Sequence, residues 1–141
     1  MPAPDVDPLL EACLDAIEAT GVAEGGVDLF AGVRPNEPDE VLVVARYDVQ
    51  AMTGQTFGEQ IDTVHRPRVQ ILSRSDREDY PAAFGRAVTA RAALAALRGP
   101  TGHGVSIIQI MPLGDPAPIG FDEAKARPLV ACNFDVWTTD G

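Results

Sequence analysis

The fold is decided by the stretch Val105-Ser106-Ile107-Ile108-Gln109-Ile110-Met111, which predicts a β-strand because apolar residues fill most of a short run. A second strand is predicted over 129–137, where Asn133-Phe134-Asp135-Val136-Trp137 closes the pattern. Residues 112–128 lie between the two strands, are rich in proline and glycine, and predict a long polar connection. The end of the chain is therefore expected to form a β-sheet from which loops and edges project.

Three further strands are predicted upstream, over 27–33, 41–49 and 68–74, and the second of these has the strongest pattern. Its first four residues, 41–44, are all apolar, although successive side chains of a strand point to opposite faces. Both faces of the sheet should therefore be covered where this strand begins.

Two helices complete the predicted elements. Asp7-Pro8 suits the start of the first helix, because Asp favours the N-cap and Pro the first helical position, and Gly21 suits its end. The second helix is predicted from about Glu78 to Arg98. Ser75, three residues before Glu78, matches a capping box with Ser at the N-cap, and a Gly-Pro pair ends the helix.

The order of elements is then α-β-β-β-α-β-β. It predicts an α+β fold with a single mixed β-sheet of about five strands and two helices packed on it. The whole chain, 1–141, is long enough for one domain with a sizeable core. We expect a flexible N-terminus over 1–6 and two long projecting loops over 50–67 and 112–128.

The loop 50–67 is long for a compact domain, and such loops are usually functional or disordered. Its scattered apolar residues include Met52, Phe57 and Ile61. Two interpretations remain open: an extended hairpin that becomes ordered against a partner, or a segment that folds back on its own domain.

The formal net charge is −10, from 21 acidic and 11 basic side chains. This balance argues against tight binding to the phosphate backbone of nucleic acids and against docking to anionic membranes. An acidic wall that DNA passes without binding is compatible with it, and so is a simple contribution to solubility. No signal peptide and no membrane span is visible, so we expect a soluble protein made in a cytoplasm.

Catalytic and metal-binding patterns are missing from the sequence. Cys13 and Cys132 each fall on an apolar face and are expected to be buried thiols, while His65 and His103 are isolated. The glycine-rich loop 99–104 follows a helix, whereas a phosphate-binding loop leads into one. Carboxylate clusters such as Asp122/Glu123 have no readable acid–base partner. We predict no enzyme, no cofactor and no metal site.

Two segments carry a resemblance to a known family. The first is Val69-Gln70-Ile71-Leu72-Ser73-Arg74, a strand that leads into the Ser75-capped helix; the second is Pro118-Ile119-Gly120-Phe121-Asp122-Glu123 with Arg127, before Asn133-Phe134-Asp135-Val136. In these features the chain resembles the tail terminator proteins of long-tailed bacteriophages, also described as tail completion or minor capsid proteins. The resemblance covers about residues 7–138. Ala126 departs from the pattern, because a glycine is expected before the arginine, and Pro128 follows it.

The resemblance implies a mixed sheet flanked by helices and a non-enzymatic virion protein of the head–tail joint, in the neck. Such proteins form a hexameric ring that caps the tail tube, ends its polymerisation and presents a surface to the head connector. The implied partners are copies of the chain itself, the major tail tube protein and a head–tail connector or completion protein. Genomic DNA is expected to pass through the channel without specific binding, and no membrane is involved. Assembly is expected in the host cytoplasm.

Subunit or partner contacts are predicted in the two long loops and beside them. The predicted contact residues are Met52, Phe57, Ile61, His65, Arg66, Arg68, Phe121, Asp122, Glu123 and Arg127. Arg127 is expected to pair within its loop or across a subunit boundary, so that Arg127→Glu should weaken assembly more than folding.

Three other functions remain open from the sequence. The first is another neck protein, such as a head-completion, connector or tube protein. The second is a small α/β enzyme or ligand-binding domain with a deep pocket beside residues 112–128. The third is an acidic inhibitor that mimics DNA, with its carboxylates gathered on one face.

Overall fold

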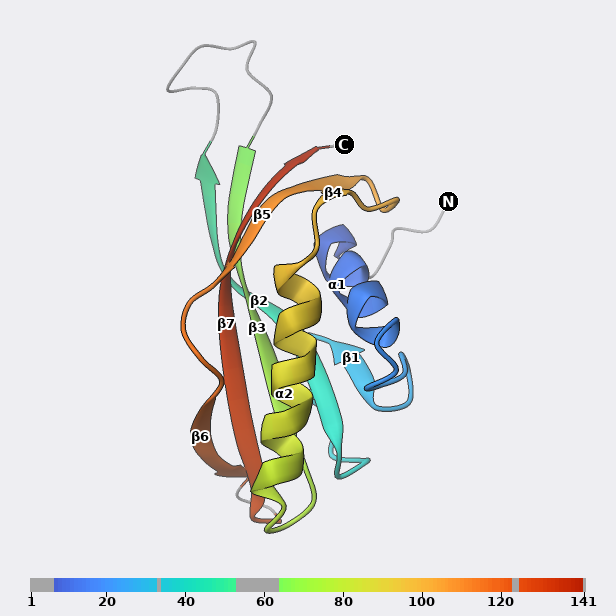
Figure 1. Ribbon diagram of the computed structural model, residues 1–141, viewed down its shortest axis with the longest axis vertical. Coiled ribbons are helices and arrows are strands. Elements are labelled where there is room, and N and C mark those ends of the chain that lie inside the picture. Colours follow the sequence, from blue (N-terminus) through green and yellow to red (C-terminus); the bar gives the residue numbers. More distant parts are fainter. Residues whose placement is uncertain (1–6, 33, 53–63, 123–124, 141) are drawn as a thin grey trace.

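Two helices lie on one side of a seven-stranded mixed β-sheet (Figure 1). The computed structural model describes residues 7–32, 34–52, 64–122 and 125–140. The helices are α1 (Pro8–Glu18) and α2 (Tyr80–Ala95). The strands are β1 (Leu29–Ala31), β2 (Val41–Met52), β3 (Val64–Arg74), β4 (Gly99–Pro100), β5 (Val105–Pro112), β6 (Ala117–Asp122) and β7 (Arg127–Asp140).

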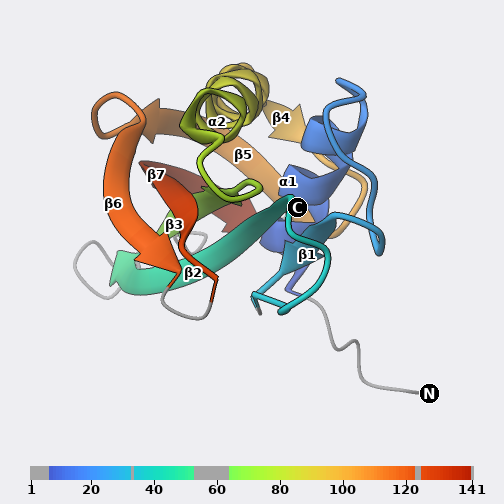
Figure 2. The same cartoon turned by 90° about the horizontal axis from the view of Figure 1, so that it is seen from below.

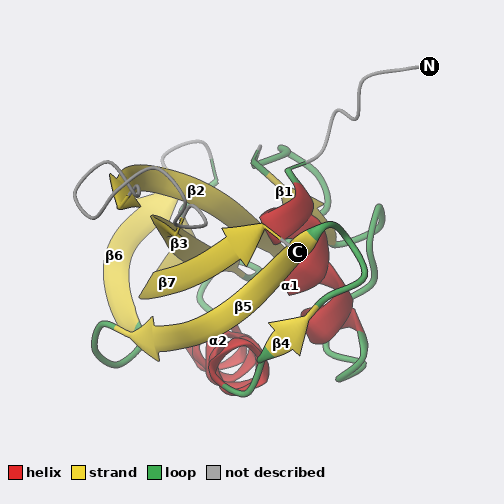
Figure 3. Cartoon of the chain, turned by 90° about the horizontal axis from the view of Figure 1, so that it is seen from above, coloured by secondary structure: helices red, strands yellow, loops and turns green. Residues whose placement is uncertain are grey.

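The strands follow the order β1-β2-β3-β7-β5-β4, and β6 also pairs with β7. Only β1 and β2 are parallel; the other pairs of this sheet are antiparallel. Viewed along the long axis, the sheet is strongly curled, with α2 outside it and β6 at its margin (Figures 2 and 3).

Strand β7 organises the end of the chain. Its first half pairs with β6 and its second half with β5, while β3 pairs with both halves. Because residues 129, 131 and 135 of β7 each have partners on both sides, β5 and β6 must lie on the same side of β7, opposite β3. A hydrogen bond from the Leu113 amide to the Asn133 carbonyl (2.8 Å) continues the pairing between them. The strands β5 and β6 therefore form one interrupted edge strand.

The α+β class, the element order and the two helices agree with the sequence-based prediction, but the strand count is wrong: the sheet has seven strands instead of about five. Each predicted strand overlaps an observed one, and β4 and β6 are additional. Strand β6 lies inside the predicted loop 112–128. Pro118 and Gly120 concealed it, yet a proline is tolerated in an edge strand because its missing N–H needs no partner there.

The helix starts show one confirmed prediction and one error. The Asp7 carboxylate accepts a hydrogen bond from the Leu9 amide (2.8 Å), as expected for an N-cap. Helix α2, however, is capped by Asp79, whose carboxylate accepts from the Ala82 amide (3.2 Å). Glu78 has a φ of 65°, a left-handed conformation that excludes it from the helix, so the predicted capping box does not form. The Ser75 hydroxyl donates instead to the Asp79 carbonyl.

The core lies between the helices and the sheet. Helix α2 presents small buried residues, mainly Ala83, Ala87 and Ala90, which allow it to pack closely on the sheet. Residues 41–44 are all buried, at most 4% exposed, which confirms that both faces are covered where β2 begins. Neither helix in the described part of the chain is long and apolar enough to span a membrane.

Cys13 and Cys132 are both buried and unpaired, as predicted. Burial raises the pKa of the Cys13 thiol to about 12, and it raises the pKa of the Cys132 thiol to about 11. Both side chains therefore act as small apolar core residues.

Candidate interaction surface

A row of large apolar side chains is exposed along the strand edge that β5 and β6 form. Among the described residues, five of the nine large apolar side chains that are exposed lie here: Ile108, Met111, Leu113, Ile119 and Phe121, each 44–64% exposed. We call this row the β5–β6 edge. Large exposed apolar residues that gather in one place usually mark an interaction site.

The backbone of the β5–β6 edge is also open. Strand β4 pairs only with Ser106 and Ile107 of β5, and β6 pairs with β7 alone in the described residues. The outward-facing N–H and C=O groups of the remaining edge residues can therefore accept another strand. Apolar side chains and unpaired backbone groups on the same strand are the requirements for adding a strand from a partner.

A buried arginine cluster holds the β6 end of this edge in place. Arg127, only 1% exposed, pairs with Asp122 across the hairpin that joins β6 to β7. It also donates to the Asn36 carbonyl (2.8 Å) and to the Asp39 carboxylate (2.9 Å). Arg74 of β3 is equally buried. It pairs with Leu129, two residues after Arg127 on β7.

Carbonyl oxygens of the segment that precedes β2 complete the cluster. Arg74 donates to the carbonyls of Pro38 (2.6 Å) and Asp39 (3.0 Å), and it lies 3.5 Å from the Asp122 carboxylate. On the exposed side of the cluster, the Lys125 ammonium pairs with the Glu37 carboxylate at 2.6 Å. The cluster thus fastens the segment 36–40 to the β6–β7 hairpin across the curl of the sheet.

The two arginines respond differently to this environment. Burial lowers the pKa of Arg74, and the neighbouring charge of Arg127 lowers it further. Burial alone would also lower the pKa of Arg127, but its hydrogen bonds to Asp122 and Asp39 outweigh that effect and the pKa is raised. The carboxylates of Asp122 and Asp39 therefore stabilise the charge of Arg127 more than the surroundings of Arg74 stabilise that of Arg74.

A second polar group lies on the helix-free face of the sheet. Arg66 of β3 makes a bidentate pair with Asp135 of β7 (2.6–3.0 Å), and this hydrogen bonding raises the pKa of Arg66. Its guanidinium lies 4.9 Å from the centroid of the Trp137 ring, a cation–π distance. Arg68 lies 3.8 Å from the same carboxylate. Asp135 therefore partly neutralises the basic group that the sequence shows around residues 65–68.

The predicted contact residues fall into two separate groups. Phe121, Asp122 and Arg127 meet at the β6–β7 hairpin, where Phe121 is exposed and the other two are paired. His65, Arg66 and Arg68 lie near the other end of the sheet, on β3. Met52 ends β2. Phe57, Ile61 and Glu123 lie outside the described residues, and the interface role of all ten stays a prediction.

Sequence reasoning missed four members of the β5–β6 edge: Ile108, Met111, Leu113 and Ile119. A signal was present, because the run 105–111 carries more apolar residues than one buried face of a strand can use. Which of these residues stay exposed depends on tertiary contacts that the sequence pattern does not specify: β4 pairs with β5 only at Ser106 and Ile107, and β6 pairs with β7 alone in the described residues.

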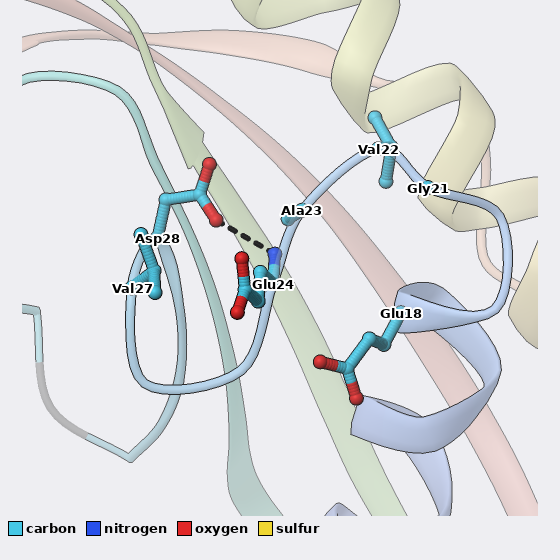
Figure 4. Close-up of a pocket in the computed structure, with 7 residues that line it drawn as sticks. All are labelled: Glu18, Gly21, Val22, Ala23, Glu24, Val27 and Asp28. Carbon is cyan, nitrogen blue, oxygen red and sulfur yellow. Dashed lines mark hydrogen bonds between the residues drawn. The ribbon is translucent and has the colours of Figure 1, made fainter.

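Three cavities lined by described residues lie away from residues 112–128, the region where the enzyme interpretation expected a pocket. One of about 410 Å³ lies between the end of α1 and the turn 21–28 (Figure 4). Its carboxylates hold that turn: Asp28 accepts from the Glu24 amide (2.7 Å) and Glu18 from the Gly25 amide (3.0 Å). Another, of about 200 Å³, is lined by His65 together with the paired Asp7 and Arg46. Their polar groups thus have structural partners.

Comparison with protein families identifies a matching family. Residues 16–127 match the family described as bacteriophage tail terminator protein. The match runs from the last turn of α1 to the first residue of β7 and includes the whole β5–β6 edge. No match to a curated protein is found.

Proposed function

The chain belongs to the bacteriophage tail terminator family, and from that premise we propose that it assembles into a hexameric ring that caps the tail tube. Membership makes it a structural component of the phage tail and of the virion, rather than an enzyme. In this role the ring ends the polymerisation of the tube and joins the tail to the head connector. Assembly takes place in the host cytoplasm.

The observation that carries the proposal is the β5–β6 edge. A monomer that exposes five large apolar side chains on an open strand edge leaves an aggregation-prone surface, unless another chain covers it. In a closed ring each subunit uses two different complementary surfaces, so a contact that covers part of this edge is repeated in every subunit.

Electrostatics supports the passage of DNA through such a ring. The chain has a net charge of −10, so a hexamer carries a total charge of about −60. A strongly acidic wall repels phosphate groups, so DNA can move past it without being held.

The test uses the purified protein and the major tail tube protein of the same phage. Tube protein is allowed to polymerise alone or with the terminator, and negative-stain images record tube lengths and tube ends. We expect an additional ring at one end of each tube and a shorter, narrower length distribution. Unchanged tube lengths, with the protein absent from sedimented tubes, would refute the proposed function.

A further inference from the structure

We propose that the free edge of β5 in one subunit pairs as an antiparallel strand with the free edge of β2 in the next copy of the chain. The sheet would then continue from subunit to subunit around the ring. This inference rests on the proposed ring and specifies which surfaces form it.

Both strands have an open side at matching positions. Strand β1 pairs only with Leu42–Val44, so the outer edge of β2 is open beyond Val44 in the described part of the chain. On the opposite margin of the sheet, β4 covers β5 only up to Ile107. The chain therefore carries one open edge on each side, as a head-to-tail ring requires.

The two open edges lie at the same level of the sheet. Following the strand pairs across it, Met111 is level with Asp135, Arg68 and Asp48, and Pro112 is level with Phe134, Val69 and Arg46. The open part of β5 thus stands opposite the open part of β2, with two strands between them.

The strand directions also fit. Because β5 is antiparallel to β7, β7 to β3, and β3 to β2, strand β5 runs opposite to β2. Rotation about an axis parallel to the strands changes neither the level nor the direction of a strand. Such a rotation therefore brings the β5 edge of one copy to the β2 edge of the next as an antiparallel pair.

The exposed side chains on the two edges are complementary. Tyr47 on β2 is 47% exposed, while Ile108 and Met111 on β5 are exposed to a similar degree. Aromatic and aliphatic side chains stabilise antiparallel pairs when they lie across from each other. Tyr47 and Ile108 both sit where the pairing register shifts within their subunit, and such bulges bend a strand. A bent edge suits a short contact between subunits of a curved wall.

Disulfide cross-linking tests this pairing. The double variant Tyr47→Cys/Met111→Cys places thiols on the two edges, while Cys13 and Cys132 are buried and should not react. The matched control is Tyr47→Cys/Phe121→Cys. Phe121 lies on the same edge, but its partner Pro128 is seven positions below Asp135, the partner of Met111, along β7. That offset is roughly 23 Å, too far for a disulfide.

Each variant is oxidised alone and on tail tubes of the same phage, and ring formation is followed by imaging. We expect a ladder of cross-linked multimers ending at the ring size for the Met111 pair, lost on reduction, and none for the Phe121 pair or the single variants. Rings without cross-links in the Met111 pair, or equal cross-linking in the control, would overturn the edge pairing while leaving the proposed function intact. Absence of any ring, on tubes or alone, would overturn both.

Discussion

Ala126 lies in the hairpin between β6 and β7 and has a φ of 55°, in the left-handed region that favours glycine. The resemblance to the tail terminators led us to expect a glycine at this position, and this backbone conformation is one that glycine adopts without strain. Replacing Ala126 with glycine should relieve the strain and raise the free energy of unfolding by about 1 kcal/mol. Urea denaturation measures the change. The control, Ala92→Gly in the exposed part of α2, should lower stability by about the same amount, because glycine weakens a helix.

Arg127 is buried and pairs with Asp39 and Asp122. Arg127→Glu places a carboxylate beside Asp122 and Asp39 and leaves the cluster without its central cation. We expect a loss of about 3–5 kcal/mol in the free energy of unfolding of the monomer. Lys125→Glu, a charge reversal on the exposed side of the same hairpin, should cost less than about 1 kcal/mol. A folded, stable Arg127→Glu protein that fails only to assemble would instead support a subunit-boundary role.

The two buried thiols predict an alkaline dependence of stability. Their pKa values rise from 9.0 to about 12 for Cys13 and about 11 for Cys132 on folding. The unfolded chain therefore loses these protons first as the pH passes 9, and the folded state is destabilised until the folded pKa is reached. The free energy of unfolding should fall by up to about 1.4 kcal/mol per pH unit for each thiol.

Denaturation curves between pH 8 and 11 measure this slope. Tyrosine and lysine titration also contributes there, so the comparison is with the Cys13→Ala/Cys132→Ala variant, which should be less stable at pH 8 but flatter above pH 9. Equal slopes for the two proteins would contradict buried, protonated thiols.

Among the elements, those with strong local signals were predictable. Asp7-Pro8 identified the start of α1, and the apolar runs located five of the strands. The missed strand β6 shows the limit of such signals, because Pro118 and Gly120 break a strand pattern unless the strand is known to lie at an edge. Edge position depends on contacts between distant segments, which local sequence does not specify. The same holds for α2, whose start shifted because Glu78 adopts a left-handed turn.

The candidate surface was only partly predictable for the same reason. Phe121, Asp122 and Arg127 were identified from a family pattern, but the pattern could not separate the exposed Phe121 from the buried arginine. Ile108 and Met111 were assigned to a strand, but the surplus of apolar residues in 105–111 did not indicate which of them stay exposed. Their exposure follows from the two-residue length of β4.

A charge on the β5–β6 edge should separate assembly from folding. Ile108→Lys places an ammonium group at the proposed contact, and since Ile108 is already 49% exposed, monomer stability should change by less than about 0.5 kcal/mol. Sedimentation with tail tubes should show the variant largely lost from tube ends. Val27→Lys makes the same change at a comparably exposed residue near β1 and should still bind. If both variants bind tubes like the unmodified protein, the β5 edge is not an interface.

At the scale of the whole molecule, the curled sheet presents one open margin at β5–β6 and another at β2, with the helices on the outside of the curl (Figure 3). A subunit with two different open margins can close into a ring when each margin meets the other type on its neighbour. The buried arginine cluster fastens the segment before β2 to the β6–β7 hairpin, so it holds the curl that sets the geometry between the margins.

Native mass spectrometry of the protein, alone and after release from tail tubes, tests ring formation most directly. A hexamer of subunits of 14.9 kDa has a mass of about 89 kDa, and we predict this species, with no larger series, from tube-bound protein. It should disappear in the Ile108→Lys variant. A protein that remains monomeric at 14.9 kDa both in solution and after incubation with tubes would contradict the ring, and with it the proposed cap.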